Sequence, residues 1–143
     1  MTKRSVIYVV LILTLASASS FGIHRRKVLV QEAKQLVWQA LPEKAKYLQQ
    51  VSLEGGPDSN YPGFYVFSVT WAGAPNGSAV YGNYAVDEST GDVFDAVSEC
   101  NEISTPSLRT LQVRIRSRIS LSDSDYRKIK GNGPMCMQGN SNR

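Results

Sequence analysis

Apolar residues recur at helical spacing over residues 26–41, near the start of the chain. The apolar positions are Leu29, Ala33, Leu36, Val37, Ala40 and Leu41. The polar positions that fall on the other faces are Lys27, Glu32, Lys34 and Gln35. This pattern predicts an amphipathic helix with one face against a core. Because Pro42 follows and cannot continue a helix, we expect the helix to end near Leu41.

From Tyr47 onwards the pattern changes to short β-rich runs separated by turn residues. The runs cover residues 51–53, 64–71, 80–86 and 93–97. Residues 74–78 contain Asn76-Gly77, a pair that tolerates the positive φ angles of a tight hairpin turn. Residues 87–92 form a second turn-rich connection. Successive runs joined in this way predict an antiparallel meander of three or four strands.

Residues 105–121 fit two structures. A helical stripe is formed by Leu108, Leu111, Ile115 and Ile119. From Leu111 to Leu121, however, apolar residues also alternate with arginine and serine, which is a strand pattern. We predict a helix, because Thr105-Pro106-Ser107 is a good helix start and Leu108 fits only the helical stripe. A shorter helix is expected from Ser122, which supplies a cap followed by first-turn acids.

Acidic and basic residues occupy different parts of the chain. Between Tyr47 and Leu108 there is no Lys or Arg, while the predicted helices on either side are basic. The acidic residues of this central segment are Glu54, Asp58, Asp87, Glu88, Asp92, Asp95, Glu99 and Glu102. We interpret the segregation as ion pairing between helices and sheet within one molecule. The alternative is a protein with two charged faces, one of which meets a partner.

The first eighteen residues have the organisation of a secretory signal peptide. Lys3 and Arg4 precede an apolar run over residues 5–16, and Ala16-Ser17-Ala18 forms a small-x-small cleavage site. The run is shorter than the roughly 20 apolar residues of a membrane-spanning helix, although an uncleaved anchor is the alternative. We therefore expect cleavage after Ala18 and a periplasmic or secreted chain without stable membrane insertion. Loss of two basic residues lowers the formal charge from +4 to 4 − 2 = +2.

The remaining chain has the size of one domain. The expected divisions are a signal peptide at 1–18, a short segment at 19–25, a domain at 26–136 and a flexible tail at 137–143. An exported chain meets oxidising conditions, so Cys100 and Cys136 are expected to form a structural disulfide worth about 4 kcal/mol. The predicted fold is α+β: an N-terminal helix packed on a three- to four-stranded antiparallel sheet, followed by one or two C-terminal helices and stapled by that disulfide.

Few residues in the sequence are suited to catalysis. His24 is the single histidine and precedes the first predicted helix, and the chain has no nucleophile elbow, zinc-binding helix motif or phosphate-binding glycine loop. We predict no catalytic residue, no cofactor and no metal ligand. A carboxylate-dependent hydrolase is the enzymatic alternative, since two carboxylates suffice for glycoside hydrolysis. Its candidate residues are Asp87, Asp92, Asp95 and Glu99.

Aromatic residues crowd the predicted strands. They are Tyr61, Phe64, Tyr65, Phe67, Trp71, Tyr81, Tyr84 and Phe94. Most are expected to pack in the core or across strands. Trp71 and Tyr81 flank the Asn76-Gly77 turn, and we predict that they form a partner-binding patch. A nucleic-acid partner is disfavoured by the small charge of the mature chain and its exported address.

The hairpin sequence at residues 86–93, Val-Asp-Glu-Ser-Thr-Gly-Asp-Val, resembles the V-D-x-x-T-G-x-V hairpin of PepSY-type repeats. The order of elements over residues 26–97 also resembles small immunity proteins of cystatin-like fold, which neutralise toxins of competing bacteria. Both resemblances imply non-enzymatic proteins, the first linked to inhibition of peptidases and the second to inhibition of toxins. We therefore expect an exported binding protein, an inhibitor or immunity protein that acts on an exported hydrolase or toxin. A structural accessory protein of the cell envelope is the alternative.

Overall fold

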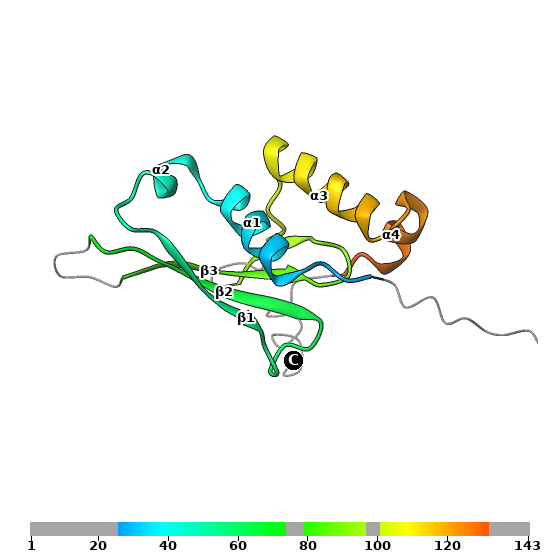
Figure 1. The fold of residues 1–143 in the computed structure, drawn as a ribbon, viewed down its shortest axis with the longest axis horizontal. Coiled ribbons are helices and arrows are strands. Elements are labelled where there is room, and N and C mark those ends of the chain that lie inside the picture. Colours follow the sequence, from blue (N-terminus) through cyan, green and yellow to red (C-terminus); the bar gives the residue numbers. More distant parts are fainter. Residues whose placement is uncertain (1–25, 74–78, 97–100, 132–143) are drawn as a thin grey trace, which may run out of the picture.

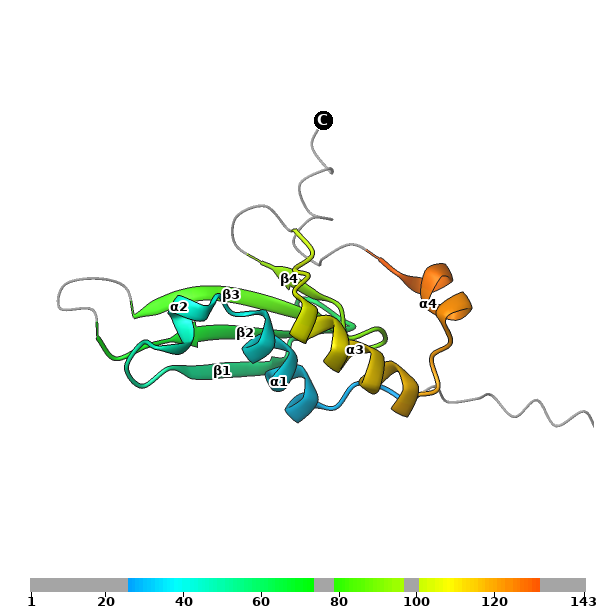
Figure 2. The same cartoon turned by 90° about the horizontal axis from the view of Figure 1, so that it is seen from above.

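Two long helices lie side by side on one face of a single sheet in the computed structural model, which describes residues 26–73, 79–96 and 101–131 (Figures 1 and 2). The helices are α1 (Val30–Ala40), α2 (Glu43–Lys46), α3 (Pro106–Arg118) and α4 (Asp123–Ile129). The strands are β1 (Ser52–Pro57), β2 (Phe64–Thr70), β3 (Val80–Asp87) and β4 (Val93–Asp95). The protein is thus α+β, as its sequence predicts.

The strands form a four-stranded antiparallel meander in the order β1-β2-β3-β4. Leu53 of β1 pairs with Val69 of β2, and further along β2 Phe67 pairs with Tyr84 of β3. Because side chains alternate along a strand, these residues all face the helices. The register shifts between Val69 and Thr70, close to the end of the sheet that leads into residues 74–78.

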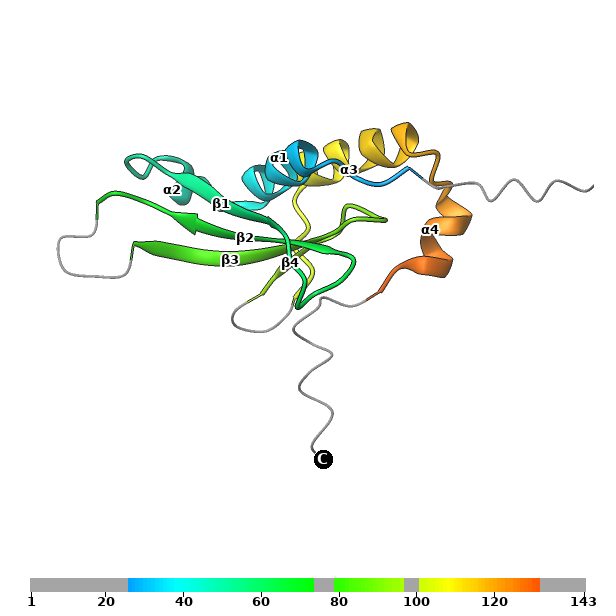
Figure 3. The same cartoon turned by 60° about the horizontal axis from the view of Figure 1, so that its bottom comes forward.

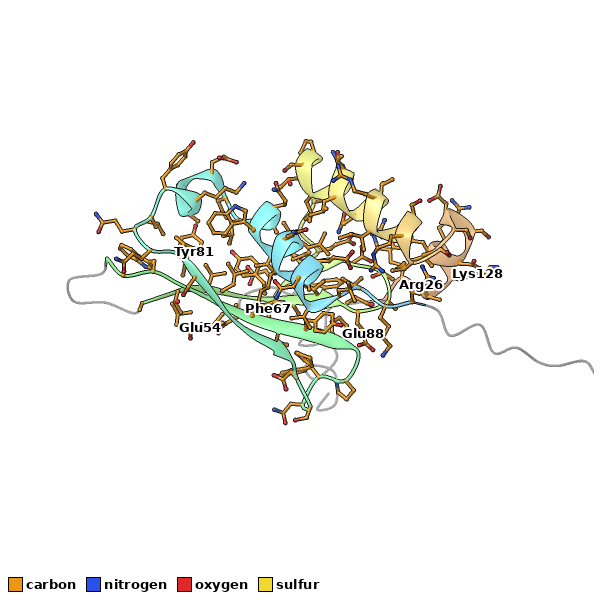
Figure 4. All side chains as sticks on the ribbon, in the orientation of Figure 1. Arg26, Glu54, Phe67, Tyr81, Glu88 and Lys128 are labelled. Carbon is orange, nitrogen blue, oxygen red and sulfur yellow. The ribbon has the colours of Figure 1, made fainter. Side chains whose placement is uncertain are left out.

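The core lies between α1 and the sheet. α1 buries Ala33, Leu36, Val37 and Ala40 of the predicted apolar stripe. The predicted helix start at residue 26 is wrong: α1 starts at Val30, and Leu29 is its extended N-cap with 57% of its surface exposed. Phe67 lies between the helices and the sheet and is fully buried (Figure 4). α3 contributes Leu108, Ile115 and the following Ile119 to the same cluster.

The helix boundaries follow from local capping. α1 ends at Ala40, with Leu41 as its C-cap just before Pro42, as expected. The chain then forms the short helix α2, which the sequence pattern did not predict. Glu43 lies in its first turn and Lys46 in its last, and the two side chains pair at 2.9 Å. Along the chain, an additional one-turn helix therefore stands between α1 and β1.

Within the ambiguous segment 105–121, residues Pro106–Arg118 form the helix α3, so the alternative of a strand is wrong there. Thr105 Oγ1 accepts a hydrogen bond from the Leu108 backbone N–H at 3.2 Å, and Pro106 occupies the first turn of α3. The predicted shorter helix is α4, where Ser122 Oγ accepts from the Asp125 backbone N–H at 3.1 Å.

Several predictions concern residues outside the described part of the chain. These are the signal peptide 1–18, the segment 19–25, the turn at Asn76-Gly77, the pairing of Cys100 with Cys136, and the tail 137–143. They stay predictions. Within residues 26–73, 79–96 and 101–131, no helix is long and apolar enough to span a membrane.

Candidate functional site

The acidic turn between β3 and β4 carries two of the four candidate catalytic carboxylates, Asp87 and Asp92, and Asp95 lies further on, at the end of β4. Asp87 accepts hydrogen bonds from the Ser89 backbone N–H at 2.7 Å, from Ser89 Oγ at 2.6 Å and from the Thr90 backbone N–H at 3.1 Å. A carboxylate that accepts hydrogen bonds from three donors of its own turn stabilises the backbone conformation of that turn. The structure thus gives Asp87 an architectural role.

Asp92 is almost completely buried, with an exposed fraction of 1%. Its carboxylate accepts from Arg116 Nη2 at 2.5 Å, from Thr90 Oγ1 at 3.0 Å and from the Tyr126 hydroxyl at 3.1 Å. Burial raises the pKa of the Asp92 carboxyl above its ordinary value, and Arg116 acts in the opposite direction by favouring the charged form. Asp92 therefore joins the β3–β4 turn to α3 and α4.

Arg116 completes this link. Its Nε donates to the Thr90 carbonyl at 2.9 Å, and its guanidinium lies 3.7 Å from the centre of the Tyr126 ring, which is a cation–π contact. Gln112, one turn earlier on α3, donates to the Gly91 carbonyl at 3.0 Å. The turn that resembles the PepSY hairpin is thus held against the C-terminal helices.

Ion pairs also connect other acidic residues of the central segment to the basic flanks. Glu88 pairs with Lys27, and Glu102 pairs with Lys130 at 2.6 Å. For Asp92, Glu88 and Glu102, the interpretation of pairing within one molecule is confirmed. Glu54, in contrast, is exposed and points away from the helices (Figure 4).

Trp71 and Tyr81, the predicted partner-binding residues, lie near the same end of the sheet. Trp71 follows β2, where its backbone N–H donates to the Ala79 carbonyl at 2.8 Å. Its ring lies against Gly73, because a Cβ on that glycine would be 2.2 Å from a ring carbon. Tyr81 of β3 is half-buried and packs against the main core. Neither Trp71 nor Tyr81 is fully exposed.

Glu99, the last of the candidate catalytic carboxylates, lies outside the described residues.

The face of the sheet opposite α1 and α3 is covered by no other described helix or strand (Figure 3). Its polar side chains hydrogen bond to one another: Ser52 to Thr70 at 2.6 Å, and Ser68 to Asn83 at 2.6 Å. Phe64 and Phe94 pack edge to face on each other, with ring centres 6.3 Å apart. These side chains of the open face are thus already bonded to or packed on one another.

A furrow on the opposite side of the molecule is the better candidate for a binding site. It runs between α1 and α3 and is bordered by β1. Three adjoining hollows share Leu111 of α3, and the largest has a volume of about 570 Å³. This largest hollow is lined by Gln31, Lys34, Gln35, Trp38, Gln39, Leu53 and Leu111. We call the three hollows together the α1–α3 furrow.

The walls of the furrow are fixed relative to each other. Glu32 in the first turn of α1 accepts from the Leu29 backbone N–H at 2.8 Å and from Arg118 Nε, in the last turn of α3, at 2.6 Å. One carboxylate thus caps the start of α1 and holds the end of α3 beside it. A surface that is ordered before binding loses less entropy when a partner arrives.

This furrow is not apparent from the sequence alone. Gln31, Gln35 and Gln39 recur every four residues on α1, and this spacing was available as a signal of one continuous polar stripe. The partner wall at Leu111 and Arg114 comes from a helix more than 70 residues further along the chain, so only the tertiary structure brings the two walls together.

Comparison with known proteins adds one relationship. No protein-family model matches the sequence, and neither does any curated protein. Among solved structures, the fold is similar to a chain in the structure of a type VI secretion system effector–immunity complex from Pseudomonas protegens. The TM-score is 0.54 and the identity is 26%, over 71% of this chain and 85% of that chain. This chain thus shares its fold with a component of that complex.

Proposed function

We propose that this chain is an exported immunity protein, which binds a toxin in the cell envelope and neutralises it without catalysis. The observation that carries the proposal is the likeness, in both fold and sequence, to a chain of an effector–immunity complex. Of the two families that the sequence resembles, we accordingly favour the immunity proteins of cystatin-like fold over the PepSY-type proteins.

The chemistry of the described residues supports binding over hydrolysis. Hydrolysis by two carboxylates requires both to face a shared cleft. Asp92 is instead buried in an ion pair with Arg116, and Asp87 is occupied by the backbone of its own turn. The α1–α3 furrow supplies an exposed, preformed surface for a protein partner.

The proposal is tested by competition between the parent bacterium and a strain that lacks this gene. On a solid surface, where cells touch, the parent should kill the deletion strain, because the latter no longer neutralises the toxin that its neighbours deliver. A plasmid copy of the wild-type gene should restore survival, and a parent without toxin secretion should not kill. Equal survival of the deletion strain beside an armed parent would overturn the proposal.

We expect the chain to lose its signal peptide and to form its disulfide during export. The intact mass of the protein from the envelope should correspond to residues 19–143, less two hydrogen atoms for a bond between Cys100 and Cys136. Replacing both cysteines with serine should lower the free energy of unfolding by about 4 kcal/mol, measured by urea denaturation. A mass that retains residues 1–18, or free thiols in the envelope protein, would contradict this prediction.

We propose that Trp71 and Tyr81 also contribute to the contact with the toxin. Buried aromatic side chains are common energetic centres of protein interfaces, and the loss of two should weaken capture of the partner by at least about 100-fold. The test is capture by the Trp71→Ala/Tyr81→Ala variant. Since Tyr81 packs against the core, circular dichroism must first show that the variant is folded. Unchanged capture by the folded variant would remove these residues from the interface.

A further inference from the structure

The α1–α3 furrow carries cations that have no partner among the described residues. Lys34 lines its largest hollow, and Arg114 lines the two adjoining ones. Neither side chain has an ion pair or hydrogen bond within residues 26–73, 79–96 and 101–131. The acidic residue of these hollows, Glu32, is already paired with Arg118. The free charge of the furrow is therefore positive.

We propose that the α1–α3 furrow binds an extended, acidic segment of the partner protein. The inference rests on the proposed function, because the partner in question is the toxin. Lys34 and Arg114 lie at different hollows along the furrow, so two acidic side chains on one segment can meet them together. Charge complementarity of this kind orients a partner and sets its register.

The glutamines of α1 match an extended backbone in spacing. Residues four apart on a helix rise by about 6 Å, and two residues of an extended strand span about 6.6 Å. Gln31, Gln35 and Gln39 thus present three amides at nearly the repeat of a strand backbone. Each amide both donates and accepts, and none of the three makes a hydrogen bond within the described part of the chain. They are free to bond to the peptide groups of such a segment.

The floor of the furrow is apolar. Trp38, Leu53 and Leu111 are all half-buried and pack against the core while they line the largest hollow. An apolar side chain between the acidic ones would bury itself there, which is the arrangement of a central anchor with a polar rim. The favoured segment is therefore extended, acidic and interrupted by at least one apolar residue.

The first test compares two variants of equal charge change. Lys34→Glu/Arg114→Glu reverses the charge of two cations that line the furrow. Lys44→Glu/Arg127→Glu reverses the charge of two exposed cations outside it. The probe is the protein that the immobilised wild-type chain retains from envelope extract of the parent and that stops growth when it is produced alone. We expect the furrow variant to raise its dissociation constant by at least about 100-fold. The control variant should change it less than about threefold, in line with the small effect of charges outside the contact.

Shape is tested separately from charge. Gln35→Trp fills the furrow at an exposed position and leaves the charge unchanged, so it should also weaken binding. Urea denaturation of each variant establishes that it is as stable as the wild type. If the folded Lys34→Glu/Arg114→Glu and Gln35→Trp variants bind the toxin normally, the furrow proposal is overturned and the proposed function stands. If the wild-type chain retains no growth-inhibiting protein, the proposed function itself fails.

The occupant is identified by a photo-crosslinker placed at Gln35, with one at Lys44 as the control. A crosslink from position 35 to an acidic segment of the toxin is the expected result. A crosslink to a second copy of this chain, whose sheet carries the exposed Glu54, would overturn the proposal. So would a crosslink to a neutral or basic segment, or crosslinking at position 44 alone.

Discussion

Replacing Arg116 with alanine is expected to lower the free energy of unfolding by about 3–5 kcal/mol, as is typical when one member of a buried ion pair is removed. Asp92 would keep its buried position but lose the guanidinium that compensates its charge. Thr90 would also lose a donor to its carbonyl, and Tyr126 would lose its cation–π contact. Urea denaturation of the purified protein measures the effect.

Arg114→Ala is the matched control, since Arg114 lies on the same helix and has no ion pair among the described residues. It should change stability by no more than about 0.5 kcal/mol. The variant Arg116→Met/Asp92→Asn removes both charges and should be more stable than Arg116→Met alone, because no buried charge is left without a partner. Equal stability of Arg116→Ala and Arg114→Ala would show that the Asp92 contacts do not hold the turn.

Gly55→Ala is expected to destabilise the protein by about 3 kcal/mol or more, since backbone strain and steric overlap each cost on the order of 1–3 kcal/mol. Gly55 has a φ of +128°, a conformation that side-chain-bearing residues rarely adopt. A Cβ there would also lie 2.1 Å from the Val66 carbonyl oxygen of the neighbouring strand. The clash involves backbone on both sides, so a change of rotamer cannot relieve it.

Gly56→Ala provides the control one residue away. A Cβ at this position would meet no atom within 4 Å, so stability should change little. Leu53 of β1 borders the α1–α3 furrow, and displacement of this strand by Gly55→Ala should therefore weaken partner binding as well. A Gly55→Ala protein as stable as Gly56→Ala would mean that β1 does not pair with β2 in the observed register.

Most of the fold could be predicted from the sequence, because the local patterns either fitted one structure only or allowed the alternative structures to be ranked. At residues 105–121 the periodicity alone favoured neither structure. The capping residue Thr105 and the inward position of Leu108 decided for the helix, and both features are present in α3. The helix α2 was missed because its four residues are too few to show a period.

Prediction of the candidate site was less successful for a physical reason. Asp92 appeared as one of several acids near a turn, and its burial depends on Arg116 and Tyr126, which come from helices far along the chain. The furrow depends on the same kind of long-range contact, since Gln35 and Arg114 share a hollow only after α3 has packed beside α1. Composition could indicate that charges would pair, but not which residues would remain unpaired.

Titration of the toxin with this protein measures whether binding alone neutralises the toxin. The toxin is recovered from the parent's envelope on the immobilised, mature and oxidised chain, eluted, and assayed for its toxic activity while the free chain is added. We expect a linear loss of toxic activity that reaches zero at one chain per toxin molecule. Complete loss at a small fraction of that ratio would indicate catalysis by this chain, and persistent activity at a molar excess would show that binding does not neutralise the toxin. Either result would contradict neutralisation by stoichiometric binding.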